Sequence, residues 1–175
     1  MSIRVLLIAF STVLVVTADN VADRESFAFD GKSNVRPVFE AVYQDGWAIL
    51  GKYEKVFKVI GDKKTWAEAD EACKSQGAKL ASIKNKEIND FIWDLAKSFP
   101  DGTGPESQIW IGGKKLWGSW MWIDGTEWDY LNWSPGEPNN AEGREDCLQI
   151  LAHSRLNGKW NDYFCDRKLA FVCQK

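Results

Sequence analysis

The chain has 175 residues, enough for one domain with short additions. Its formal net charge is only −3, and the 22 basic and 25 acidic side chains are interspersed. Basic residues come as isolated pairs such as Lys63-Lys64 and Lys114-Lys115. This pattern is typical of a solvated surface rather than a nucleic-acid-binding stripe, so we expect no nucleic-acid partner.

The first 18 residues have the order of a secretory signal peptide. A single early cation, Arg4, precedes an apolar run, and the small residues up to Ala18 suit a signal peptidase. The run covers about twelve residues, whereas a helix that spans a bilayer needs roughly 20. We expect cleavage after Ala18, a secreted extracellular protein and no membrane insertion.

Residues 19–46 form a polar lead segment without a helical, strand or heptad period. At Trp47 apolar runs begin to alternate with turn residues, so we place one domain over 47–175. Its first strand-like run is 56–60. No internal repeat is visible.

Two helices are predicted next. Thr65 and Glu68 have the spacing of a capping box, which predicts a helix over 66–76, and Gly77 suits the left-handed position that closes it. A second helix follows, capped near Asn85. Its apolar residues form a single buried stripe, made of Ile88, Phe91, Ile92, Leu95 and Ala96.

Short strands and long loops make up the rest. The strand-like runs are 80–83, 109–112, 120–123, 148–151 and 169–172. Asn157-Gly158 is a hairpin signal. Helices followed mostly by strands predict an α+β fold. The segment 130–146, rich in Pro, Gly and Asn, is long for a structureless connection, and such loops are usually functional or disordered.

Five side chains in or after that loop carry the oxygen donors that calcium prefers, namely Glu137, Asn139, Glu145, Asn161 and Asp162. Calcium takes about six to eight oxygen ligands, often carboxylates. The set contains neither Cys nor His, which argues against zinc and copper, and magnesium prefers a site richer in water. The sequence also allows a cis peptide bond before Pro138, which would turn the flanking side chains toward one point.

The cysteines are even in number: Cys73, Cys147, Cys165 and Cys173. In a secreted chain this implies two disulfides, and the residues alone leave more than one pairing open. Zinc is disfavoured, because no Cys-x-x-Cys pair exists and His153 is the single histidine.

Ten tryptophans are unusual for this length, and we expect most of them in the core. Trp117 could flank a ligand, but anchoring in the core or a loop is the interpretation we favour. Asn132 begins a glycosylation sequon, yet Pro135 follows it and Trp133 is expected to be buried, so we do not expect a glycan there.

The order of these motifs resembles the C-type lectin domain. The resemblance covers about Trp47 to Lys175 and rests on Glu137-Pro138-Asn139, the acidic pair before Cys147, Trp160-Asn161-Asp162 and Trp110-Ile111-Gly112. It implies two helices with two small antiparallel sheets and a long calcium-binding loop. It also implies the disulfides Cys73–Cys173 and Cys147–Cys165.

The same resemblance implies that the five donors hold one calcium ion and that Glu137, Asn139, Glu145 and Asn161 also bind sugar. In the family, Glu-Pro-Asn accompanies mannose, glucose, N-acetylglucosamine or fucose, and Gln-Pro-Asp accompanies galactose. A second calcium site is not expected, because Gly113-Lys114-Lys115 follows the central strand and offers no acid. The implied partners are glycans, including microbial ones in innate immunity, with a homo-oligomer as a source of avidity.

Two other functions are compatible with the sequence. A lectin-like domain could bind protein, mineral or ice, with calcium structural or absent, since fold does not fix function. Glu137 and Glu145 could serve a glycosidase, but clustered oxygen donors fit a cation better than an acid and a base. Ser134, Ser154 and His153 form no recognisable triad, so we do not expect an enzyme.

Overall fold

The computed structural model describes residues 42–98, 108–152 and 158–175. The expected signal peptide (1–18), the lead segment up to residue 41, Asn157 and His153 therefore lie outside the described residues. Within the three ranges, no helix has the length and apolar character needed to cross a membrane.

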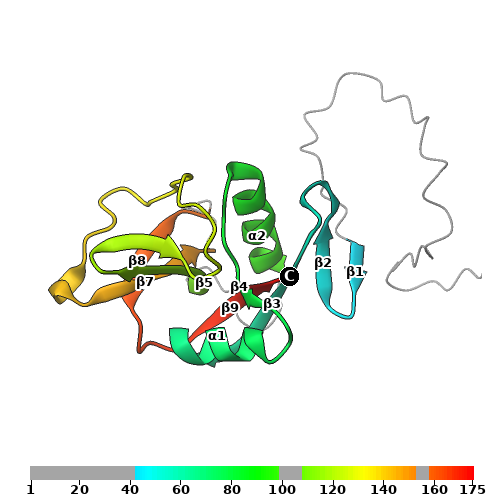
Figure 1. Cartoon of the computed structure of the whole chain (residues 1–175), viewed down its shortest axis with the longest axis horizontal. Coiled ribbons are helices and arrows are strands. Elements are labelled where there is room, and N and C mark those ends of the chain that lie inside the picture. The colour runs from blue at the N-terminus through cyan, green and yellow to red at the C-terminus, as the bar shows by residue number, and fades with distance from the viewer. Residues whose placement is uncertain (1–41, 99–107, 153–157) are drawn as a thin grey trace, which may run out of the picture. The chain divides into compact units, whose positions relative to one another are not determined.

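The described part of the chain contains two helices and nine strands (Figure 1). The helices are α1 (Trp66–Lys74) and α2 (Lys86–Ser98), and two single 3₁₀ turns are η1 (Gly51–Tyr53) and η2 (Ala141–Gly143). The strands are β1 (Val42–Gln44), β2 (Trp47–Leu50), β3 (Lys55–Lys64), β4 (Lys79–Leu80), β5 (Gln108–Leu116), β6 (Ser119–Trp122), β7 (Glu145–Leu151), β8 (Trp160–Phe164) and β9 (Leu169–Gln174).

Both predicted helix starts are confirmed. The Thr65 side chain accepts from the Glu68 N–H, and the Glu68 carboxylate accepts from the Thr65 N–H at 2.9 Å, which completes the capping box. At α2, Oδ1 of Asn85 accepts from the Ile88 N–H at 2.9 Å. Helix α1 ends slightly before the predicted residue 76, and Gly77 has the expected left-handed backbone with φ +65°.

The strands form one connected sheet in the order β1-β2-β3-β9-β5-β7-β8, with β4 paired to β9 and β6 to β5. The contact between β5 and β9 is parallel and places Ile109 beside Ala170. The expectation of two small antiparallel sheets is therefore wrong in this detail, because the parallel contact joins the two halves. Local alternation could not reveal it, since alternation does not specify which strands become neighbours.

Alternate residues of β5 belong to two different hydrophobic clusters. Ile109 and Ile111 pack with the apolar stripe of α2, whereas Trp110 between them packs with Trp66 at the start of α1. Because successive strand side chains point to opposite faces, the two helices cover opposite faces of the sheet. Packing is tight within this strand, where a Cβ on Gly113 would lie 2.5 Å from Cδ2 of Leu148.

Both disulfides that the resemblance implied are present. Cys73–Cys173 joins α1 to β9 across a sequence separation of 100, and Cys147–Cys165 joins β7 to the chain after β8 across a separation of 18. Closing loops of these lengths stabilises the fold by about 4.7 and about 3 kcal/mol in the chain-entropy description. The second bridge braces the two strands next to the long loop.

Candidate functional site

The long loop, residues 130–146, lies against β8, which is the edge strand at one end of the sheet. The backbone N–H of Trp160 donates to the carbonyl of Asn132 at 2.8 Å, and the N–H of Ser134 donates to the carbonyl of Trp160 at 2.8 Å. Trp133 and Trp160 thus form a parallel bridge. These bonds hold the loop beside the strand that carries Asn161 and Asp162.

Asp162 fixes the middle of the loop. Its carboxylate accepts from the backbone N–H groups of Asn139 at 3.1 Å and Asn140 at 2.8 Å. Oε2 of Glu137 accepts from the same Asn139 N–H at 3.0 Å. The peptide bond between Glu137 and Pro138 is cis. Two carboxylates that are far apart in the sequence therefore converge on one backbone amide.

Glu145 closes the loop from the other end. It is only 4% exposed, and its carboxylate accepts from the Ala141 N–H at 2.8 Å. Its own N–H donates to Oδ1 of Asn140 at 3.1 Å. Asn140 has a left-handed backbone with φ +47°, which Asn tolerates better than most residues. The predicted set did not include Asn140, although the adjacent Asn139-Asn140 pair was the available sequence signal.

Burial and like charge act on the glutamates of this cluster. Burial raises the pKa of Glu137, and the neighbouring Asp162 carboxylate raises it further. Burial also raises the pKa of Glu145; the Ala141 N–H opposes this, and the charges of Asp162 and Glu142 add to it. A cation between these groups would favour their ionised forms. The cluster is thus short of positive charge.

The structure brings together Glu137, Asn139, Glu145 and Asp162 through these contacts. Asn161 precedes Asp162 in β8 and is half-buried, but its side chain takes no part in the hydrogen bonds given above. Across residues 42–98, 108–152 and 158–175, no three Asp, Glu, His or Cys side chains are placed to hold a metal ion by themselves. The loop and β8 nevertheless bring carboxylate and amide side chains into one cluster, and oxygen donors of both kinds are ones that calcium accepts.

A cluster of tryptophan rings packs around Trp160, and it includes Trp133 of the loop. Trp160 is fully buried and packs edge-on against Trp122 and Trp133, with centroids 5.5 and 6.0 Å away. The ring centroids of Trp128 and Trp122 are 4.6 Å apart. The expectation that most tryptophans are core residues is thus confirmed. For Trp117 it is wrong, because this side chain is 92% exposed.

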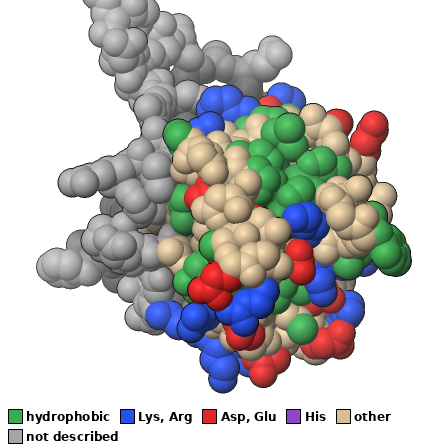
Figure 2. Space-filling model, turned by 90° about the vertical axis from the view of Figure 1, so that its left-hand side faces the viewer, with side chains coloured by type: hydrophobic (Ala, Val, Ile, Leu, Met, Phe, Trp, Pro, Cys, Tyr) green, Lys and Arg blue, Asp and Glu red, His purple; other side chains and the backbone are tan. Residues whose placement is uncertain are grey.

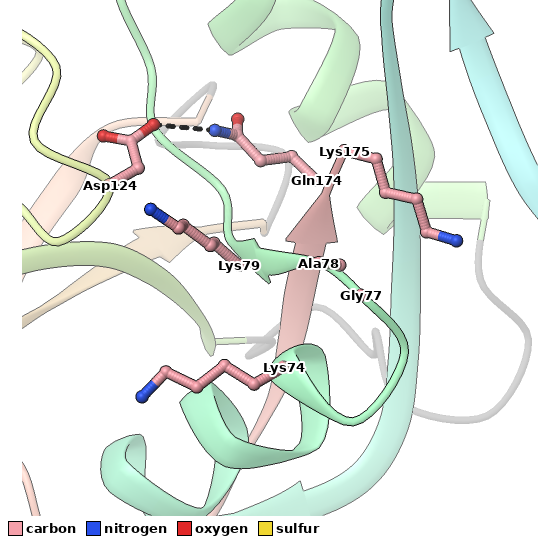
Figure 3. Close-up of a pocket in the computed structure, with 7 residues that line it drawn as sticks. All are labelled: Lys74, Gly77, Ala78, Lys79, Asp124, Gln174 and Lys175. Carbon is pink, nitrogen blue, oxygen red and sulfur yellow. Dashed lines mark hydrogen bonds between the residues drawn. The ribbon is translucent and has the colours of Figure 1, made fainter.

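A pocket of about 430 Å³ lies elsewhere, beside the C-terminal strand (Figure 3). The dashed line in Figure 3 is the 2.9 Å hydrogen bond from Gln174 to Asp124. Burial opposes ionisation of Asp124, yet hydrogen bonds from Ser82 and Thr126 leave its pKa below the ordinary value. Ser82, Thr126 and Gln174 thus satisfy the Asp124 carboxylate beside the pocket.

Comparison with known proteins places this geometry in a family. A family profile described as Lectin C-type domain matches residues 62–175. The chain belongs to the C-type lectin domain family. A lectin of Pleurodeles waltl is 34% identical to this C-type lectin domain protein over 126 residues, which is 70% of each chain. The chain spans only about a third of the length of two other curated relatives, asialoglycoprotein receptor 2 of Mus musculus and the low affinity immunoglobulin epsilon Fc receptor of Homo sapiens.

Two solved structures show the range of the family. The cow carbohydrate-recognition domain of CD23, crystallised in the presence of a GlcNAc2Man3 oligosaccharide, is 32% identical, with a TM-score of 0.63, covering 77% of this chain and 96% of that one. A calcium-independent type II antifreeze protein is 31% identical, also with a TM-score of 0.63, covering 77% and 95%. The relatives are lectins and lectin-like binding proteins, which supports a non-enzymatic role at the family level.

Proposed function

We propose that this C-type lectin is a secreted, calcium-dependent protein that binds mannose-type sugars: mannose, glucose, N-acetylglucosamine or fucose. The observation that carries the proposal is the Asn139 N–H shared by Glu137 and Asp162, which ties the loop and β8 into one acidic cluster. The domain would span 47–175, after a signal peptide over 1–18 and a lead segment over 19–46. Two disulfides suit an oxidising, extracellular compartment.

The five proposed ligands are Glu137, Asn139, Glu145, Asn161 and Asp162. Three carboxylates and two amides around one divalent cation leave a net charge of about −1 and give an all-oxygen donor set. When bound, calcium would supply coordination to two neighbouring sugar hydroxyls. We propose one such ion, because Lys114 and Lys115, near the end of β5, stand where further acids would be needed.

The protein side chains would orient those hydroxyls. A hydroxyl has one proton to donate and two lone pairs to accept with. Carboxylates of Glu137 and Glu145 can only accept, whereas the amide groups of Asn139 and Asn161 can donate. An acid and an amide therefore complement each hydroxyl, and their order in Glu137-Pro138-Asn139 would select the mannose-type arrangement.

Affinity for one sugar should be low, because the outer part of the cluster is shallow: Asn139 is exposed and Glu137 is half-buried. A dissociation constant on the order of 1 mM corresponds to about −4 kcal/mol. Glycan arrays, such as those on microbial surfaces, and a homo-oligomer of the protein would raise the effective affinity through multivalency.

The test is retention of the mature chain on immobilised mannose, with calcium and with excess chelator. We expect retention in calcium alone, and loss of retention in Glu145→Gln and Asn161→Ala. Glu142→Gln is the matched control, because Glu142 lies in the same loop and pairs with Arg144 at the surface. Equal retention in chelator would refute the proposal.

A second candidate is a calcium-independent, lectin-like binder of protein, mineral or ice. It is favoured by the likeness to the calcium-independent antifreeze protein. Retention on mannose, together with a calcium titration by calorimetry, separates the two, since this candidate predicts neither calcium binding nor retention.

A further inference from the structure

Trp117 differs from every other tryptophan of the chain. It is 92% exposed, whereas the other nine are buried or partly buried. A large aromatic surface in water is unfavourable, and aromatic side chains are enriched where proteins bind ligands or partners. The exposed indole therefore calls for an explanation that the fold does not supply.

The backbone makes the choice of tryptophan more unusual. Leu116 pairs with Ser119, so Trp117 and Gly118 form the two-residue turn between β5 and β6. Both have positive φ, +51° and +85°. Such turns favour Asn or Gly at the first position, and a bulky residue there is uncommon. The fold alone would prefer a small polar residue where Trp117 stands.

The antiparallel pairing of β5 and β7 puts this turn and Glu145 at the same end of the sheet. Lys114 of β5 pairs with Cys147 of β7. Trp117 lies three residues after Lys114, and Glu145 lies two residues before Cys147, so both continue from this pair in the same direction. Strands β5 and β7 run side by side at the left of Figure 1.

The surroundings of the turn are amphipathic. Glu145 pairs with Phe164 of β8, whose ring lies 5.5 Å from the Arg144 guanidinium and 5.6 Å from that of Arg167. Figure 2 views the side of the molecule that is on the left in Figure 1, and this side carries both hydrophobic and charged side chains. Apolar surface and hydrogen-bonding groups together suit a sugar, which has an apolar ring face and polar edges.

We propose that Trp117 forms an extended subsite that stacks against the sugar unit next to the one held at the calcium site. The inference rests on the proposed function and adds a ligand class to it, because it makes the domain selective for oligosaccharides over single sugars. The short β5–β6 hairpin fixes the backbone of Trp117, and an indole side chain has only two rotatable torsions, so little conformational freedom is lost when a sugar ring packs on it.

The test compares mannose with a mannose trisaccharide by calorimetry in calcium, using Trp117→Asn, which suits the turn. We expect the variant to bind the trisaccharide about 2- to 10-fold more weakly and to bind mannose unchanged, since aromatic contacts contribute on this scale. Leu131→Ala, a change at a second exposed apolar side chain, is the control and should alter neither affinity.

Each other outcome has a separate meaning. Absence of mannose binding in the wild type refutes the proposed function itself. Mannose binding with the same trisaccharide affinity in wild type and Trp117→Asn overturns only the subsite. Self-association of the wild type that Trp117→Asn abolishes, measured by sedimentation, would make Trp117 an interface between copies of the chain and also overturn the subsite.

Discussion

The indole N–H of Trp160 donates to Oδ1 of Asn89 at 2.8 Å, inside the hydrophobic core. Nδ2 of Asn89 in turn donates to the carbonyl of Gly158 at 3.2 Å, and the Asn89 side chain is only 1% exposed. This single amide joins α2 to β8. It therefore helps to set the position of Asn161 and Asp162, which directly follow Trp160.

Replacing Asn89 by Leu should destabilise the domain. The variant leaves the Trp160 indole N–H buried without its partner, at about 1–3 kcal/mol, whereas the Gly158 carbonyl keeps the hydrogen bond from Asn132. We expect a loss of at least about 1 kcal/mol in the free energy of unfolding, measured with urea. Asp90→Asn is the control, because its exposed pair with Lys86 contributes less than about 1 kcal/mol. Equal stability of the two variants would contradict the role of Asn89.

Gly113→Ala should also destabilise the fold, for a steric reason. The added Cβ would lie 2.5 Å from Cδ2 and 2.9 Å from Cβ of buried Leu148. Relief requires a shift of strands β5 and β7, and overpacking of this kind costs about 1–3 kcal/mol. Gly51→Ala is the matched control, because nothing lies within 4 Å of its added Cβ. Calorimetric melting should separate the two variants, and similar melting temperatures would show that β5 adapts.

Features that depend on neighbours in sequence could be predicted from the sequence. The capping box at Thr65, the buried stripe of α2 and the closing Gly77 follow from local spacing. The disulfide pairing came from the family resemblance, since spacing alone left it open. The parallel contact between β5 and β9 depends on strands far apart in the chain, and no local pattern encodes it.

The residue types of the candidate site were predictable from the sequence, but its hydrogen bonds were not. Glu137 and Glu145 are visible as acids in an unusually long loop, and Asp162 as an acid in a later strand. The contributions of the Asn139 and Ala141 backbone N–H groups depend on the loop's conformation, which residue types do not specify. Trp117 was misjudged because a tryptophan at the end of a strand has the same sequence context whether it packs inward or projects outward.

The raised pKa values of Glu137 and Glu145 should make the stability of the calcium-free domain depend on pH. The folded state holds these protons more tightly than the unfolded chain, where Glu titrates near 4.5. The resulting stabilisation is fully present below about pH 4.5 and is lost as the pH rises through the raised folded values. In chelator, we expect this loss to be smaller in Glu145→Gln, which stays neutral throughout the titration.

Calcium should reverse that trend. The ion binds the ionised carboxylates and stabilises the folded state by mass action, so the melting temperature should rise with calcium near neutral pH and lose this gain in acid. Scanning calorimetry of wild type and Glu145→Gln at several pH values tests this. An equal rise in both proteins would place the ion elsewhere.

The sequon at Asn132 should remain unglycosylated. Its Nδ2 donates to the Gly158 carbonyl at 2.9 Å, and its Oδ1 accepts from Nζ of Lys159 at 2.9 Å. A glycan on Nδ2 would displace the side chain from both partners at the edge of β8. We expect no mass change when protein secreted by eukaryotic cells is treated with an N-glycanase. A shift of one glycan would show that Asn132 is modified before this contact forms.

The bridge between Trp133 and Trp160 has a consequence for solubility. Terminal strands of open sheets carry unpaired backbone groups that can recruit strands from other molecules. Here the Trp160 N–H donates to the Asn132 carbonyl, and the Trp160 carbonyl accepts from the Ser134 N–H. The loop therefore covers part of the edge strand β8. A substitution that breaks the hydrogen bonds between the loop and Trp160 should therefore promote aggregation as well as weaken ligand binding.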